Sequence, residues 1–179
     1  PKIRSLAKEI LNEPEEISVA ISKPAEGVTQ KVYLAHEEQK VALVRHILGD
    51  KDDFQSIIIF CSTKKKVEKL ARTLHQKGYA CQGISSDYEQ EQREEALSDF
   101  RSGKTRIMVA TDVMSRGIDI KGIDLVINYD VPGDAEDYVH RIGRTARAKT
   151  EGMAVTLVCP DDMFKFSKIE RLIERELDK

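Results

Sequence analysis

The segment Ile57–Cys61 consists of five consecutive apolar residues, IIIFC. An unbroken apolar run of this length, rich in β-branched residues, predicts a strand that is buried on both faces, as strands of parallel sheets are. Further strands are predicted at 17–21, 28–35, 79–84, 106–110, 125–129 and 154–158, and helices at 1–12, 38–48, 64–77, 89–101, 134–142 and 162–176. From residue 28 onward strands and helices alternate, which predicts an α/β fold with a mainly parallel sheet covered by helices.

Polar residues follow several of the predicted strands. Ligands of open parallel sheets bind outside the carboxyl ends of the strands, so these positions are the first candidates for a functional site. The residues with groups able to contact an anion or a ribose are Ser62–Thr63, Ser85–Asp87, Thr111–Asp112, Asp130 and Pro160–Asp161.

Three arginines recur at three-residue spacing in the segment 134–149, DAEDYVHRIGRTARAK. Arg144 and Arg147 lie one helical turn apart, so in a helix both guanidinium groups leave the same side. A planar, permanently charged guanidinium suits phosphate recognition. Charge alone favours a plainer interpretation, in which Arg141, Arg144 and Arg147 form a solvated basic face. The net charge of −2 excludes a uniformly basic surface, so any anion site must arise from local clustering.

Gly103-Lys104-Thr105 imitates the end of a phosphate-binding P-loop. The pattern requires a glycine at position 98, where this chain has Ser98, and it requires a strand followed by a helix. Here a helix precedes and a strand follows, so Gly103 is interpreted as a helix stop. The chain therefore offers no P-loop of its own for a triphosphate.

Two further segments carry candidate ligand contacts. In ATDVMSRGIDI (110–120), Thr111 can contact a phosphate, Gly117 permits close approach of the backbone, and Asp119 can accept from a ribose hydroxyl. Helix capping by Thr or Asp and an ordinary glycine turn explain the same residues without a ligand. In QEQR (90–93), Arg93 can bind a nucleic-acid phosphate, but it can also lie over the core with its aliphatic stem. Asp87 and Gln90 have the spacing of a capping box.

The cysteines and termini indicate an intracellular fragment. Cys61, Cys81 and Cys159 are interpreted as buried, reduced thiols, and no Cys/His spacing predicts a metal site. There is no membrane-spanning run or signal-peptide pattern, so we expect no membrane and a cytoplasmic location. The chain begins at Pro1 without Met, which favours a piece of a longer protein.

Four motifs together resemble the DEAD-box RNA helicases. IIIFCST (57–63), QEQR (90–93), ATDVMSRGIDI (110–120) and HRIGRTAR (140–147) occur in the order and at about the separations found in the C-terminal RecA-like domain of that family. The resemblance implies a RecA-like three-layer α/β/α sandwich at 28–179. Residues 1–27 resemble the end of the preceding RecA-like domain and the interdomain linker. The pairing of RTAR with RGIDI is similar to the bacterial RhlE-like branch.

The resemblance also implies roles for particular residues. Arg144 and Arg147 match arginine fingers that reach the γ-phosphate of ATP bound mainly by the other domain. Gly117 and Asp119 match positions beside the ATP ribose. Arg116, His140 and Phe60 match interdomain positions. The positions that match contacts to the RNA sugar-phosphate backbone are Thr63, Arg93 and Thr111.

The implied function is that of the C-terminal half of an ATP-dependent RNA helicase. ATP with Mg²⁺ would be held mainly by an N-terminal RecA-like domain that is missing from this chain, RNA would be bound with weak sequence specificity, and this half alone would be inactive. A non-catalytic RNA-binding or scaffold module of the same fold is an alternative, as is a helicase group that acts on DNA. The oligomeric state stays open.

The chain departs from the family pattern at two places. Ser85-Ser86-Asp87 replaces the usual His-Gly-Asp, which puts in doubt a close approach of the backbone to RNA at Ser86. Ala146 replaces the usual glycine between the fingers, and Lys149 replaces another soon after. Ala146 is harmless in a helix, but it would disturb the finger geometry if the position requires a positive φ.

Overall fold

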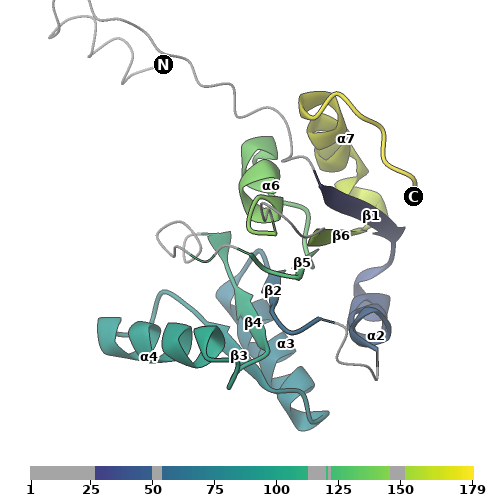
Figure 1. Cartoon of the computed structure of the whole chain (residues 1–179). Coiled ribbons are helices and arrows are strands. Elements are labelled where there is room, and N and C mark those ends of the chain that lie inside the picture. The colour runs from purple at the N-terminus through teal and green to yellow at the C-terminus, as the bar shows by residue number, and fades with distance from the viewer. Residues whose placement is uncertain (1–26, 50–53, 113–119, 121, 146–151) are drawn as a thin grey trace, which may run out of the picture.

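The chain forms a six-stranded sheet in which every pairing is parallel (Figure 1). The computed structural model describes residues 27–49, 54–112, 120, 122–145 and 152–179. The strands lie in the order β1-β6-β5-β2-β4-β3, so β2 and β5 are central. Their bounds are β1 Val28–Leu34, β2 Ile57–Phe60, β3 Cys81–Ile84, β4 Ile107–Ala110, β5 Leu125–Asn128 and β6 Gly152–Val158. The predicted α/β class with a mainly parallel sheet is confirmed.

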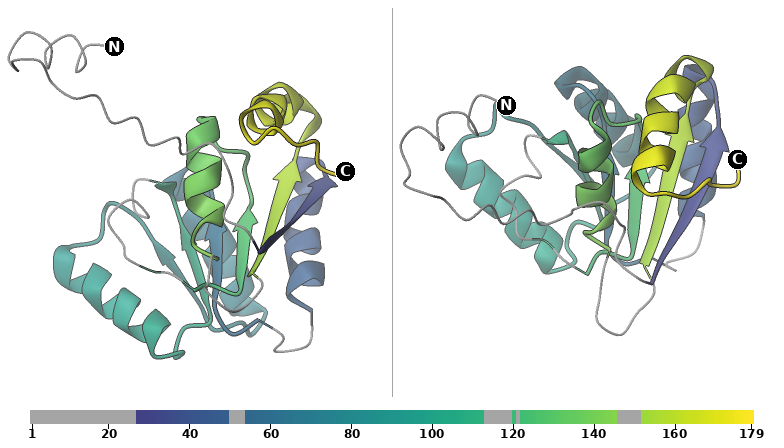
Figure 2. Two further views of the ribbon diagram at one scale, coloured as in Figure 1. Left: turned by 45° about the horizontal axis from the view of Figure 1, so that its top comes forward. Right: turned by 90° about the horizontal axis from the view of Figure 1, so that it is seen from above.

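Helices cover both faces of this sheet (Figure 2). Their bounds are α2 Glu37–Leu48, α3 Lys64–Gln76, α4 Gln90–Arg101, α6 Ala135–Ile142 and α7 Met163–Leu172, with a 3₁₀ turn, η1, at Pro160–Asp162. Helices α2 and α3 pack on one face, against a core that includes Ile57 and Ile59. Helix α4 packs on the opposite face against Ile58 and Phe60, and α6 and α7 cover β1 and β6 on that side.

Strand β2 is buried on both faces, as the apolar run at 57–61 predicted. All four of its side chains are at most 5% exposed, because alternate residues point into cores on opposite faces. Phe60 is paired with Ala110 of β4 on one side and with Asn128 of β5 on the other. The carboxyl ends of β4, β2 and β5 therefore lie side by side at one edge of the sheet.

The described helices begin and end within one residue of the predicted bounds except at the end of α7, and the capping partners of α4 also differ from the prediction. The capping box of α4 uses Glu89 and Gln92, so the predicted pairing of Asp87 with Gln90 is wrong. Gln90 is already the first helical residue, and its side chain donates to Glu94 at 2.7 Å. Helix α7 ends at Leu172 rather than at residue 176.

The end of α7 has a physical reason in the backbone that follows. Glu174 has a φ of 53°, which breaks the helix, and Leu177 then folds back and is 5% exposed. The same device acts after α4, where Gly103 has a φ of 79° and ends the helix as its sequence position indicated.

The three cysteines are free thiols, of which Cys61 is buried and Cys81 and Cys159 are half-buried. Burial raises the pKa of Cys61, and it raises the pKa of Cys81 to about 12. The prediction of full burial thus holds for Cys61 alone. Across the described residues no helix has the length and apolar character needed to cross a membrane. The predicted end of a preceding domain, residues 1–27, lies almost entirely outside the described residues.

Candidate functional site

The polar residues that follow β2, β4 and β5 meet at one edge of the sheet, as their positions after the strands predicted. In the structure these residues form hydrogen bonds and ion pairs with one another and with α6. Ser62 contacts Asp130, and Asp112 contacts Arg141 of α6. Two connected polar groups result, one centred on the Asp130 carboxylate and one on the Arg141 guanidinium.

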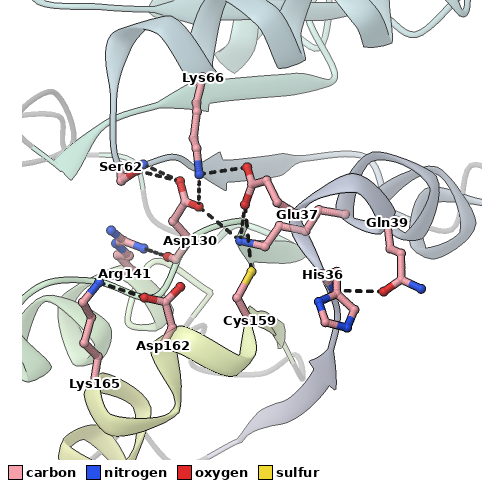
Figure 3. A network of polar contacts seen from close by, with 11 residues as sticks. His36, Glu37, Gln39, Ser62, Lys66, Asp130, Arg141, Cys159, Asp162 and Lys165 are labelled. Atoms are coloured by element: carbon pink, nitrogen blue, oxygen red, sulfur yellow. Dashed lines mark hydrogen bonds and ion pairs between the residues drawn. The ribbon is translucent and has the colours of Figure 1, made fainter.

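Asp130 is the acceptor at the centre of the first group (Figure 3). Its Oδ2 accepts hydrogen bonds from the backbone N–H and from the Oγ of Ser62, both at 2.8 Å. Its Oδ1 accepts from Lys66 Nζ at 2.7 Å and from Lys40 Nζ at 3.2 Å. Glu37 completes the cluster with ion pairs to the same two lysines, at 2.9 Å to Lys66 and 3.1 Å to Lys40.

The charges in this cluster stabilise one another. Burial alone would raise the pKa of Asp130, but hydrogen bonds from Lys66 and Ser62 and the charge of Lys40 lower it to about 2. Burial likewise opposes the charge of Lys40, whose side chain is fully buried, yet the Asp130 and Glu37 carboxylates raise its pKa. Both ammonium groups also lie over the ring of Tyr129, at 5.1 and 5.8 Å from its centroid. The two carboxylates and the two ammonium groups are therefore ionised at neutral pH.

Arg141 is buried, with an exposure of 2%. Its Nε and Nη2 donate to the two oxygens of Asp112 at 2.5 and 2.6 Å, in a bidentate fork. Its Nη1 donates to Asn128 Oδ1 at 2.9 Å and to the backbone oxygen of Asp130 at 3.0 Å. The guanidinium stacks over Phe60 at 4.9 Å. The interpretation of Arg141 as part of a solvated basic face is wrong, because partners from three strand ends enclose it.

Arg144 lies beyond the helix. Helix α6 ends at Ile142, so Arg144 is in the turn that follows, and the idea that helical spacing alone orients it does not apply. Its backbone is fixed on both sides, since its N–H donates to Arg141 O at 3.1 Å and its carbonyl accepts from Ile123 N at 3.0 Å. In contrast to Arg141, the residue is half-exposed.

The turn that carries Arg144 is packed tightly against β6. Thr145 is fully buried, and its Oγ donates to Ile142 O at 2.8 Å. A Cβ placed on Gly152 would lie 2.4 Å from Thr145 Cβ and 2.6 Å from its carbonyl oxygen. Position 152 therefore requires glycine so that β6 can approach this turn.

The residues predicted to contact RNA lie at or near the same edge. Thr63 is exposed, and its side chain caps α3 by accepting from Lys66 N at 3.3 Å. Thr111 is half-buried at the end of β4. Arg93, on α4, is half-buried and donates to Ser86 O at 3.4 Å. Ser86 is exposed, and among the described non-glycine residues only Glu174 has a positive φ, so serine fits the backbone at position 86 without strain.

Two residues with predicted interdomain roles are also described. Phe60 is fully buried beneath Arg141, and His140 is exposed on α6, 4.0 Å from Asp137. Arg116, Gly117, Asp119 and Arg147 lie outside the described residues, as does the departure at Ala146. In the described part of the chain, no group of three His, Cys, Asp or Glu side chains has the geometry to hold a metal ion.

Lys40 and Lys66 were not among the predicted site residues, and Asp130 was predicted only as one of several polar residues that follow strands. One signal was available. Lys40, Val44 and Leu48 recur at four-residue spacing and are the buried residues of α2, so a lysine stood on a buried helix face. A buried lysine requires a carboxylate partner, and Asp130 is the acidic residue directly after the strand predicted at 125–129.

Comparison with known proteins places this arrangement in a family. Residues 39–149 match the family described as "Helicase conserved C-terminal domain". The E. coli DEAD-box protein SrmB, solved in complex with the regulator of ribonuclease activity A, superposes with a TM-score of 0.80 at 35% identity, over 86% of this chain and 90% of that chain. The chain belongs to the DEAD-box helicase family. It corresponds to the C-terminal domain of that family, with its RecA-like fold.

Curated relatives agree with this assignment to the DEAD-box family. The DEAD-box ATP-dependent RNA helicase CshA of Geobacillus kaustophilus is 40% identical over 99% of this chain and 38% of its own length. The ATP-dependent RNA helicase RhlB of Xanthomonas axonopodis pv. citri is 41% identical over 98% of this chain and 31% of its own length. The chain thus spans about a third of these relatives. Their names are CshA and RhlB, so the RhlE-like branch stays a prediction.

Proposed function

We propose that the chain is the C-terminal half of an ATP-dependent RNA helicase, and that Arg144, together with Arg147, acts as an arginine finger. The observation that carries this proposal is the contrast within α6 and its following turn. Arg141 is buried and binds Asp112, Asn128 and the Asp130 backbone, whereas Arg144 is half-exposed at the surface, on a turn whose backbone is hydrogen-bonded on both sides. A preorganised cation at a domain surface suits the stabilisation of charge that develops during phosphoryl transfer.

The described residues fit a phosphate that comes from outside the chain. The chain has no P-loop of its own, so the nucleotide, with Mg²⁺, is held mainly by an N-terminal RecA-like domain. ATP, when bound there, supplies the phosphoryl group that is transferred to water. The part of this chain is to present a guanidinium on a rigid turn, with Thr145 locked beneath it against Gly152. His140 and Phe60 belong, in this proposal, to the surface and the support of the same interdomain contact.

RNA is the second proposed partner. Thr63 and Thr111 follow the neighbouring strands β2 and β4, and Arg93 lies on α4 beside Ser86. Hydroxyls and a guanidinium in this setting suit the sugar-phosphate backbone, and contacts to the backbone carry little sequence information. We therefore propose weak sequence specificity for this half. The relatives named as RNA helicases support RNA over DNA.

Replacement of Arg144 by Ala tests the finger role in a protein that contains this chain and its N-terminal domain. We expect the RNA-stimulated ATPase to fall by roughly a thousandfold, with RNA binding spared, because the side chain acts on the transition state. Arg101→Ala is the matched control, since Arg101 is exposed at the end of α4. Near-normal turnover by Arg144→Ala would remove the residue from this role. The present chain alone is expected to show no measurable ATPase, and robust hydrolysis by it would overturn the division of labour between the domains.

A further inference from the structure

A cavity of about 390 Å³ lies between helices α2 and α3. Residues of α2 line one wall, residues of α3 line the other, and Tyr129, which follows β5, lines the cavity as well. Its volume falls in the range of roughly 300–1,000 Å³ that is usual for ligand sites. Because α2 and α3 pack on the face of the sheet that is opposite α6, this cavity is separate from the arginine network described above.

The walls of the cavity carry one paired and one unpaired set of charges. Glu37 of α2 and Lys66 of α3 form an ion pair at 2.9 Å. Glu38 of α2 and Lys69 of α3 line the same cavity and are exposed. Neither Glu38 nor Lys69 has an ion-pair partner among the residues that the structure describes. The cavity therefore offers an unpaired carboxylate on one wall and an unpaired ammonium group on the other.

The hydroxyl of Tyr129 is a second group without a partner. The residue is 5% exposed, and within the described part of the chain its hydroxyl makes no hydrogen bond. The one fully buried side-chain atom without a partner in that part is Arg93 Nε, so Tyr129 Oη keeps an opening to the cavity that the residue lines. Burial raises the pKa of Tyr129, so the hydroxyl stays protonated. It can donate one hydrogen bond and accept others.

Apolar side chains complete the lining. Leu70 is 3% exposed and Val41 is half-buried against the same core. A uniformly negative ligand such as RNA would meet the carboxylates of Glu37 and Glu38, and a uniformly positive ligand would meet the two lysines of α3. The lining thus favours an occupant that has an apolar centre, a hydrogen-bonding group and one charge of each sign.

The position of the unpaired charges favours a peptide over a free amino acid. Glu38 and Lys69 stand on separate helices, whereas the two charges of a free amino acid share one carbon atom. In an extended peptide alternate side chains point the same way. A segment with the pattern basic-x-apolar-x-acidic therefore directs all three side chains at one surface, with the charges apart from each other.

We propose that the cavity between α2 and α3 docks a short extended segment of a partner protein with the pattern basic-x-apolar-x-acidic. The apolar side chain lies between Val41 and Leu70, and the basic and acidic side chains pair with Glu38 and Lys69. The hydroxyl of Tyr129 donates to a backbone carbonyl of the segment. This docking goes beyond the proposed helicase function and does not depend on it.

The experiment titrates the isotope-labelled chain with synthetic peptides and follows the backbone amide signals of Val41 and Leu70 by NMR. The probe is Lys-Ala-Leu-Ala-Glu, with both ends blocked. Two comparison peptides carry Lys at both charged positions or Glu at both. We expect the mixed peptide to bind about fivefold more tightly than either comparison peptide, because each of those places one charge against a like charge at an exposed rim.

Substitutions at the rim are expected to reverse this preference. Glu38→Lys makes both unpaired charges positive, so the peptide with two Glu should become the tightest of the three. Lys69→Glu makes both negative, so the peptide with two Lys should become the tightest. Both positions are exposed, and the fold is expected to tolerate either change.

Removal of the tyrosine hydroxyl tests the floor of the cavity. Tyr129→Phe keeps the ring beneath the two lysines and is expected to weaken the mixed peptide by about fivefold, the equivalent of one hydrogen bond. Tyr88→Phe is the matched control, because Tyr88 is a half-buried tyrosine that lies outside this cavity. The control is expected to leave the affinity unchanged.

The remaining outcomes would each overturn the proposal. Absence of signal changes at Val41 and Leu70 with all three peptides would mean that the cavity docks no such segment. Equal affinity for the three peptides, or an unchanged order in Glu38→Lys and Lys69→Glu, would remove the charges from recognition. Binding of free L-leucine as tight as that of the mixed peptide would make the cavity a site for small zwitterions instead.

Discussion

Arg141 and Arg144 are identical side chains three residues apart, and the structure treats them in opposite ways. Arg141 is buried, stacks on Phe60 at the end of β2 and makes four hydrogen bonds to partners at the ends of β4 and β5. Arg144 is half-exposed on the turn after α6, where its backbone is fixed. Arg141 holds the strand ends together in a network with Asp112, Asn128 and Asp130, which we call the platform. Arg144 lies on the turn that follows this platform. The two arginines differ in burial and in their contacts, and these differences indicate different roles. Their charge and their spacing along the sequence do not distinguish them.

The largest effect expected from this comparison is on stability at Arg141. Arg141→Ala removes the guanidinium and leaves the Asp112 carboxylate without its fork, so we expect a loss of roughly 3–5 kcal/mol in the free energy of unfolding. Urea unfolding followed by circular dichroism measures the change. The double variant Arg141→Ala with Asp112→Ala is expected to lose less than the sum of the two single variants. Additive losses would mean that the fork does not hold the platform together.

The sequence predicted the strands and helices around the two arginines well. The apolar run at 57–61 identified β2 as a strand buried on both faces, and the helix predicted at 64–77 matches α3, Lys64–Gln76, to within one residue. These features are local, because each follows from periodicity within one segment. The expected RecA-like domain followed from four motifs, and the family comparison confirms it.

The different roles of Arg141 and Arg144 could not be predicted from the sequence, because they depend on contacts between distant segments. Arg141 is buried because Asp112 and Asn128, 29 and 13 residues away, lie at the ends of β4 and β5 on either side of β2, and strand order is a property of the whole sheet. The same holds for Asp130, whose partners come from α2, α3 and the end of β2. A pattern shows which residues are polar, but long-range pairing decides whether they face a ligand or one another.

The support beneath Arg144 can be broken without touching either arginine. Gly152→Ala places a Cβ 2.4 Å from that of Thr145, so the turn or the start of β6 must move. We expect a loss of roughly 1–3 kcal/mol in the free energy of unfolding, in the range of overpacked cores. If the turn moves, the ATPase of the two-domain protein falls as well. Gly133→Ala is the matched control, since a Cβ at that position meets no atom within 4 Å. Equal stability of the two variants would contradict the close approach of β6.

Lowering the pH tests how much the ionised carboxylates around Asp130 contribute to stability. The pKa of Asp130 is lowered from 3.8 to about 2, so its ionised form is favoured by folding. The contribution is fully present above about pH 4 and is lost as the pH falls toward 2, and the shift corresponds to roughly 2 kcal/mol. The pKa of Glu37 is also lowered, which adds to the same acid range.

Unfolding free energies measured between pH 5 and pH 2.5 give the slope for the unaltered chain. Other carboxylates titrate in this range, so the informative quantity is the difference from Asp130→Asn, whose slope is expected to be shallower. Ser167→Ala, at an exposed site on α7, provides a control variant with an unchanged slope. Identical slopes for the unaltered chain and Asp130→Asn would remove Asp130 from the acid response.

The smallest expected effect completes the contrast between the arginines. Arg144→Ala is expected to change the free energy of unfolding by less than about 0.5 kcal/mol, because the side chain is half-exposed and the backbone bonds that fix the turn remain. The same variant is the one expected to lose most of the ATPase. Arg144→Ala would remove activity and spare stability, whereas Arg141→Ala, three residues away, would lower stability. That result would show that α6 supports the fold and that the turn after it carries the chemistry. A stability loss at Arg144 comparable to that at Arg141 would instead mean that both arginines belong to the platform, and the finger would have to be sought at Arg147.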